Sequence, residues 1–138
     1  MLRKINYNDL SSIYELGGKY DSIFSKVYDL KSYLENPIYI LNCYVEEGII
    51  EGFIIANKLY DTVEILLIYV DDKYRQQGVA TKLLESLEKK AVNNLLLEVS
   101  VQNEPALNLY KKLGYEILNT RKKYYNGTDA YVMKKVLK

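Results

Sequence analysis

Histidine is absent from the sequence, and only one cysteine, Cys43, is present. Without histidine, neither a Ser-His-Asp nor a Cys-His catalytic group can form, and zinc or iron would lack an imidazole ligand. Acid–base chemistry therefore falls to Glu, Asp, Tyr, Lys or Cys, and no metal is expected. Cys43 lies in an apolar stretch with no sign of activation nearby, and it has no partner for an intramolecular disulfide. With no N-terminal signal segment, this cysteine usage favours the cytoplasm.

Long apolar runs and a strong net charge are also missing. Glu64, Asp71 and Glu98 interrupt the apolar stretches well short of the roughly 20 residues that span a membrane. The 19 basic residues face 18 acidic ones, which gives a formal net charge of +1. No overall basic field of the kind used by nucleic-acid-binding proteins is therefore present. We expect neither a membrane protein nor direct binding to nucleic acid.

Apolar periodicity predicts a single α/β (α+β) domain over residues 1–138, with a mixed sheet of six or seven strands and about four flanking helices. The sequence has strand-like runs at residues 2–7, 39–45, 49–59, 63–70, 95–101, 115–124 and 129–136. Helical patterns cover residues 10–16, ended by Gly17-Gly18, and then 29–35, 79–92 and 104–113. Glu46-Glu47-Gly48 and Asn126-Gly127 are hairpin signals, and the 63–70 and 95–101 strands should lie at the centre.

The turn between the 63–70 strand and the 79–92 helix is the first candidate site. It reads Arg75-Gln-Gln-Gly-Val-Ala-Thr81 and stands where a helix begins. The unpaired N–H groups and the partial positive charge of a helix start favour an anion such as phosphate. Gly78, without a Cβ, allows close approach, although it could equally serve only to ease a tight turn. Arg75 and Lys82 could add positive charge.

Three residues further along are candidates for chemistry. Glu98 interrupts a run that is apolar on both faces, as expected of a covered central strand, so a carboxylate buried there would be a candidate general base. The alternative is that Glu98 is a solvated residue near a strand end. Tyr110 falls on the apolar stripe of the 104–113 helix, where a core tyrosine is the alternative reading. Asn103 stands at the expected N-cap of that helix, and capping alone could explain it.

Taken together, in this order and spacing, these motifs resemble the GCN5-related N-acetyltransferase (GNAT) superfamily. The resemblance covers about residues 49–136 and rests on the Arg75–Thr81 turn and on Asn103-Glu-Pro-Ala-Leu-Asn-Leu-Tyr-Lys-Lys-Leu-Gly-Tyr115. It implies the GNAT fold, acetyl-CoA as co-substrate without a metal, Glu98 as the base and Tyr110 as the proton donor. It further implies that the coenzyme is bound by Ile68, Tyr69, Val70, Gln76, Gln77, Gly78, Val79, Ala80, Thr81 and Asn103.

A narrower resemblance points to the ribosomal-protein alanine N-acetyltransferase branch. It rests on Leu97-Glu-Val-Ser-Val-Gln-Asn103 and on the stretch from Arg121 to Met133. It implies that the acceptor is a protein N-terminus, namely the N-terminal alanine of small-subunit ribosomal protein eighteen. Tyr124, Tyr125 and Asp129 would line a peptide groove, with ordinary hairpin packing as the alternative. Acetylation of a small amine or a lysine side chain stays open, as does a non-catalytic acetyl-CoA-binding module.

Overall fold

A computed structural model describes residues 1–90, 93–122 and 127–137 of the chain. The strands are β1 (Leu2–Lys4), β2 (Tyr39–Glu46), β3 (Ile49–Leu59), β4 (Thr62–Val70), β5 (Asn94–Ser100), β6 (Glu116–Arg121) and β7 (Ala130–Val136). The α-helices are α1 (Leu10–Tyr20), α2 (Phe24–Val27), α3 (Leu30–Leu34), α4 (Val79–Glu88) and α5 (Glu104–Lys112). Two 3-10 turns, η1 (Tyr7–Asp9) and η2 (Asp72–Tyr74), precede α1 and α4.

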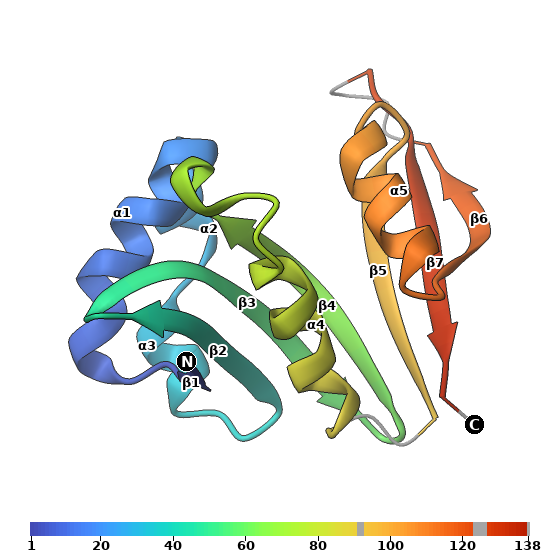
Figure 1. Cartoon of the computed structure of the whole chain (residues 1–138). Helices are drawn as coiled ribbons and strands as arrows, with labels where there is room; N and C mark the ends of the chain where they lie inside the picture. Colours follow the sequence, from blue (N-terminus) through green and yellow to red (C-terminus); the bar gives the residue numbers. More distant parts are fainter. Residues whose placement is uncertain (91–92, 123–126, 138) are drawn as a thin grey trace.

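All seven strands belong to one mixed sheet in the order β1-β2-β3-β4-β5-β7-β6 (Figure 1). Neighbouring strands are antiparallel except for β4 and β5, which are parallel and are joined through α4. The mixed sheet with flanking helices is confirmed, and β4 and β5 lie at its centre as predicted.

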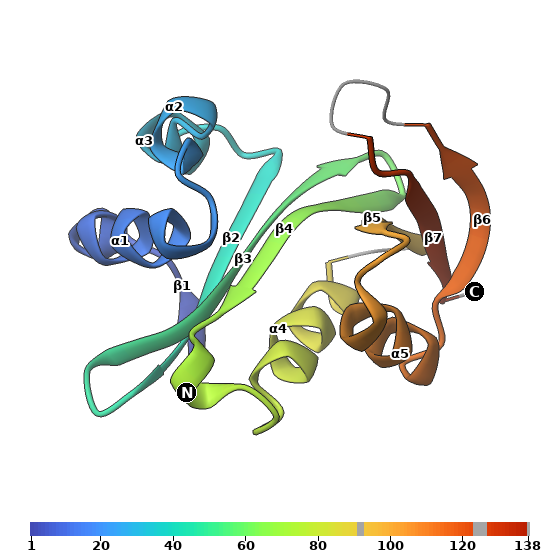
Figure 2. The ribbon, with the colours of Figure 1, turned by 90° about the horizontal axis from the view of Figure 1, so that it is seen from above.

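Helices cover the two faces of the sheet unequally (Figure 2). On one face, α4 and α5 pack over a core that includes Leu83, Leu95 and Met133. On the other face, α1, α2 and α3 gather over β2, β3 and β4, around Phe24 and Phe53. This explains why β3 is apolar on both faces in its middle. Among the described residues, no helix has the length and apolar character needed to cross a membrane.

The first helix differs from the prediction at its end. Gly17-Gly18 was expected to terminate it, but α1 runs through both glycines to Tyr20. A Cβ on Gly17 would lie 2.7 Å from ring atoms of Phe24, so this glycine makes room for an aromatic ring. Phe24 belongs to α2, a four-residue helix that was not predicted because so short an element shows no period.

The two hairpin signals have different outcomes. Glu47 and Gly48 adopt left-handed φ values of 51° and 78°, which is the conformation expected of the β2–β3 turn. A two-residue turn at Asn126-Gly127 would pair Arg121 with Val132, but Arg121 pairs with Ala130. The pairing of β6 with β7 is confirmed, but its register at Arg121 differs by two residues from the register that this turn would set. Asn126 itself lies outside the described residues.

Candidate active site

The two central strands separate after a short stretch of pairing. β4 and β5 pair at Thr62↔Asn94, Val63↔Leu95 and Glu64↔Leu96, and not beyond. Figure 1 shows the two ribbons diverging towards their carboxyl ends. The Arg75–Thr81 turn follows the end of β4, and Asn103 follows the end of β5, so both sequence motifs lie at the open end. In parallel sheets, this edge is where ligands usually bind.

A β-bulge in β4 accompanies the separation. Ile55 pairs with Leu67 and Ala56 pairs with Ile65, so Leu66 is an extra residue without a partner on β3. The extra residue shifts the alternation of side chains. Before the bulge Ile65 faces the α4 side, and after it Ile68 faces that side. No glycine or proline marks the bulge, so it could not be predicted from the local sequence.

Beyond the bulge, β4 has an edge that β5 does not use. The Asp71 N–H donates to the Glu51 carbonyl on β3 at 2.9 Å. Because main-chain groups alternate sides along a strand, those of Tyr69 also point to β3, while those of Ile68 and Val70 point away. Consistent with this, the Val70 carbonyl accepts from Arg75 Nε at 3.2 Å. Of the three predicted residues, Tyr69 is thus excluded as a main-chain donor at this edge.

The turn that follows has the geometry of an anion site. Gln76 and Gly78 adopt left-handed φ values of 63° and 83°. The N-cap of α4 is Gly78, and within the described part of the chain no side chain caps this helix. The first helical bond runs from the Lys82 N–H to the Gly78 carbonyl at 3.1 Å. The N–H groups of Val79, Ala80 and Thr81 therefore have no acceptor within the helix.

Space is available above this turn. A Cβ built on Gly78 would meet no atom within 4 Å. Gln76 and Gln77 are exposed, and the Gln77 amide donates to the Lys73 carbonyl at 3.4 Å. An anion could therefore approach the main chain without displacing a side chain.

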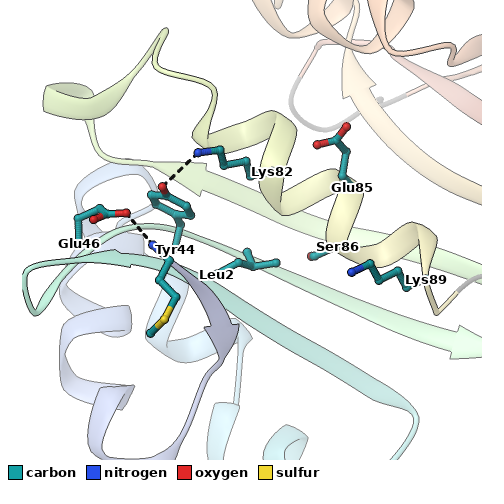
Figure 3. Close-up of a pocket in the computed structure, with 8 residues that line it drawn as sticks. Leu2, Tyr44, Glu46, Lys82, Glu85, Ser86 and Lys89 are labelled. Atoms are coloured by element: carbon teal, nitrogen blue, oxygen red, sulfur yellow. Dashed lines mark hydrogen bonds and ion pairs between the residues drawn. The ribbon is translucent and has the colours of Figure 1, made fainter.

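The two basic residues near the turn are held elsewhere. Arg75 forms an ion pair with Asp72 at 3.2 Å, and its guanidinium lies 5.0 Å from the centre of the Tyr20 ring. Lys82 donates to the Tyr44 hydroxyl at 3.2 Å, and Figure 3 shows it directed at that residue. Neither side chain points its charge at the Gly78 turn in this conformation.

Figure 3 also shows a hollow on the outer side of α4, against β1 and β2. Its volume is about 520 Å³, and it is lined by Met1, Leu2, Tyr44, Glu46, Lys82, Glu85, Ser86 and Lys89. Apart from Lys82, none of the residues singled out from the sequence lines it. The hollow is thus separate from the opening between β4 and β5.

Glu98 is not buried, contrary to the expectation from its apolar run. Leu97 and Val99 face the core under α4 and α5, so Glu98 points to the opposite face. No helix covers β5 on that face in the described part of the chain (Figure 2). The Glu98 side chain is 32% exposed, and its Oε2 lies 2.9 Å from Nη1 of Arg121. The uncovered face is the reason that the burial prediction was wrong.

Tyr110 lies on the covered side. It packs in the core under α5, with its ring centre 5.7 Å from that of Tyr115, and its hydroxyl makes no hydrogen bond within the described residues. Burial raises the pKa of Tyr110 to about 12. The phenol therefore stays protonated at neutral pH and can act as a proton donor. Glu98 and Tyr110 thus belong to opposite sides of β5.

Asn103 does cap α5. Its side-chain oxygen accepts from the Ala106 N–H at 3.3 Å, which satisfies one of the unpaired donors of that helix. Capping therefore accounts for the side-chain oxygen. The position at the open end of β5 agrees with the second role that the family motif implies, which stays a prediction.

The remaining predicted groups are less informative. Tyr124 and Tyr125 lie outside the described residues. Asp129 pairs with Lys122 at 3.4 Å on the surface. Cys43 is fully buried, and burial raises the pKa of its thiol to about 11, so it stays protonated near neutral pH.

Sequence reasoning missed two residues near the site, Arg121 as partner of Glu98 and Gly52 on β3. A Cβ on Gly52 would lie 2.8 Å from the Tyr69 carbonyl and 3.2 Å from Val79. Gly52 therefore lets the first turn of α4 approach the sheet closely. A glycine within a strand pattern was the available signal for this close contact, whereas the pairing of Arg121 needed the β6–β7 register.

Known proteins share both the sequence pattern and the fold. A sequence model of the acetyltransferase (GNAT) family matches residues 6–115. A protein of Bacillus subtilis (strain 168), provisionally named ribosomal protein bS18-alanine N-acetyltransferase, is 31% identical over 139 residues, covering 96% of this chain and 92% of its own. The ribosomal protein bS18-alanine N-acetyltransferase of Escherichia coli (strain K12) is 36% identical over 89 residues, which is 62% of this chain and 60% of that protein.

Solved structures of acetyltransferases are also similar to this chain. The crystal structure of the ribosomal-protein-S18-alanine N-acetyltransferase from Escherichia coli has a TM-score of 0.81 at 26% identity and covers 99% of this chain and 93% of its own. A provisionally named streptothricin acetyltransferase from Bacillus anthracis, in complex with acetyl coenzyme A, has a TM-score of 0.72 at 25% identity, covering 78% and 68%. The chain belongs to the acetyltransferase (GNAT) family and is an N-acetyltransferase.

Proposed function

We propose that this enzyme transfers the acetyl group of acetyl-CoA directly to the N-terminal α-amine of a protein, namely the N-terminal alanine of ribosomal protein bS18. The observation that carries the proposal is the position of Glu98 and Tyr110 on opposite sides of β5, beside the opening to β4. The acceptor assignment is supported by the Bacillus subtilis relative, whose similarity extends over 96% of the chain. In this proposal, residues 1–138 act as one domain in the cytoplasm.

The donor half of the site fits a coenzyme with a pyrophosphate. The uncapped start of α4 offers N–H groups from Gln76 to Thr81, with open space above Gly78. The unpaired edge of β4 offers the main-chain groups of Ile68 and the N–H of Val70, whose carbonyl accepts from Arg75. The amides of the pantetheine arm can pair with these groups as a strand would. Asn103 would contact the coenzyme from the end of β5.

The acceptor half fits an amine that arrives from the other face. A protein α-amine has a reference pKa of about 7.7 to 8.0, so a modest base is enough to neutralise it near neutral pH. Glu98 takes this proton, directly or through water. Arg121 holds the carboxylate on the uncovered face, where a peptide end can reach it.

The acetyl transfer itself follows from these two halves of the site. The neutral amine attacks the thioester carbonyl, a new C–N bond forms, and the C–S bond breaks. A main-chain N–H at the β4 edge stabilises the negative charge that develops on the carbonyl oxygen. The thiolate leaves with the electron pair of the C–S bond and takes the proton of the Tyr110 hydroxyl. The nitrogen of the new amide loses its second proton, which returns, directly or through water, to the Tyr110 phenolate. No metal enters this scheme.

The direct test uses acetyl-CoA and a set of acceptors. A peptide with the N-terminal sequence of bS18 is compared with the same peptide blocked at its α-amine and carrying an internal lysine, and with a polyamine. We expect acetylation of the free N-terminal alanine alone, located by tandem mass spectrometry. Turnover on the polyamine or the lysine, with none on the N-terminus, would replace the proposed acceptor by a small amine or a side chain.

A further inference from the structure

The end of α1 contacts the start of the Arg75–Thr81 turn, here named the donor turn, and the η2 segment before it through Tyr20. The Tyr20 hydroxyl accepts from the Asp72 N–H at 2.8 Å, which is the first main-chain donor of η2. The Tyr20 ring lies under the Arg75 guanidinium, with 5.0 Å from the guanidinium carbon to the ring centre. The ring also contacts Tyr69 at a centroid distance of 5.5 Å. Tyr20 thus contacts β4, η2 and Arg75, the first residue of the donor turn.

A second contact from α1 supports the same segment. Lys19 pairs with Asp71 at 3.3 Å. Asp71 accepts in turn from the Lys73 N–H at 3.2 Å and so caps η2. Lys19 is half exposed, and an exposed ion pair contributes little by itself. The more specific contact is therefore the hydroxyl of Tyr20.

The donor turn has few anchors of its own. Four residues in and just before it are exposed, namely Lys73, Arg75, Gln76 and Gln77. The turn also includes residues with left-handed φ values, which would change if the turn became mobile. An anion site made of main-chain N–H groups depends on their being fixed before the ligand arrives. A contact that fixes the entry to the turn therefore acts on coenzyme affinity.

We propose that Tyr20 is a positioning residue for the donor turn, holding η2 and Arg75 so that the Gly78 turn keeps its anion-binding shape. The inference rests on the proposed binding of the coenzyme pyrophosphate at this turn. It assigns to α1 a role in binding the donor, in addition to its packing against the aromatic core on the other face.

The structure provides a closely matched control on the same helix. The Tyr14 hydroxyl accepts from the Leu30 N–H at 3.0 Å, the first main-chain donor of α3, and donates to the Tyr28 carbonyl. Tyr14→Phe and Tyr20→Phe therefore remove the same group, from the same helix, in the same type of contact. Only Tyr20 contacts the donor turn.

The experiment compares both variants by calorimetric titration with CoA and by kinetics with two donors. With Tyr20→Phe we expect about three- to tenfold weaker CoA binding and a similar rise in the KM for acetyl-CoA, with kcat retained. With S-acetylpantetheine, which lacks the pyrophosphate, Tyr20→Phe should match the wild type. Tyr14→Phe should bind CoA normally, although its melting temperature falls at least as far.

Each other outcome overturns the inference. Unchanged CoA affinity in Tyr20→Phe, or an equal loss in Tyr14→Phe, would mean that the hydroxyl only stabilises the fold. An equal loss with S-acetylpantetheine would place the effect away from the pyrophosphate. Failure of the wild type to bind CoA at all would instead overturn the proposed function, and the inference with it.

Discussion

Replacing Gly78 by alanine tests the donor turn most directly. Gly78 has a φ of +83°, and a Cβ at this position would meet nothing within 4 Å. In the free protein, the added methyl group therefore causes no clash, and its cost is limited to the left-handed backbone, about 1 kcal/mol. In the proposed complex with the coenzyme, the same methyl group would occupy the space through which a phosphate reaches the main chain.

Gly48 provides the matched control. It lies at the tip of the β2–β3 hairpin with a φ of +78°, and a Cβ there also meets nothing within 4 Å. Gly48→Ala and Gly78→Ala should therefore lose similar free energies of unfolding, corresponding to roughly 2 to 5 °C in Tm. The two variants differ only in their proximity to the proposed phosphate site.

The expected difference appears in the binding of the donor. A hydrogen bond to a charged group contributes about 1.5 to 3 kcal/mol, so losing one to the pyrophosphate weakens CoA binding by about tenfold to 100-fold. Gly78→Ala should show this loss in titration calorimetry and in the KM for acetyl-CoA, whereas Gly48→Ala should show none. If both alanine variants bound CoA as the wild type does, the turn would not be the phosphate site.

The chemical groups lead to further predictions. Glu98→Gln should lower kcat by about 100-fold or more with unchanged CoA affinity, and equal turnover near neutral pH would remove Glu98 as the base. Tyr110→Phe should lower kcat at unchanged acceptor KM, and an unchanged rate would exclude the phenol as the proton donor. Burial raises the pKa of Tyr110 to about 12 and also raises that of Tyr115. Because tyrosines of the unfolded chain ionise near pH 10, the free energy of unfolding should fall as pH rises from about 10 to about 12. Denaturant titrations should show this fall, and a smaller one in Tyr110→Phe.

Local sequence patterns predicted most of the framework. The left-handed turn at Gly48, the helix start at Gly78 and the cap at Asn103 each depend on a few neighbouring residues. Such features follow from backbone preferences and side-chain hydrogen bonds that act over one turn of chain. The two strand–helix units and the mixed sheet could therefore be predicted from the sequence.

The features that failed depend on contacts between distant segments. Gly17 continues its helix because Phe24 packs against it, and no local rule contains that contact. Glu98 is on an open face because α1 to α3 cover β2 to β4 and not β5 (Figure 2). An apolar run alone does not predict which face of the strand a helix will cover. The bulge at Leu66 likewise depends on how β3 and β4 fit together.

The bulge and the early end of β4–β5 pairing together leave a strand edge to which the proposed extended donor can bind. From Glu64, the last paired residue, to Val70 the edge of β4 runs for about 20 Å at roughly 3.3 Å per residue. An unpaired strand edge invites a further strand, and proteins normally cover it. Here the edge lies inside the sheet, between β4 and β5. In the proposed complex, a pantetheine arm, with its amides in a row, would pair with the part of β4 that β5 does not use. Its thioester would then lie beside β5, between the face that carries Glu98 and the face that carries Tyr110.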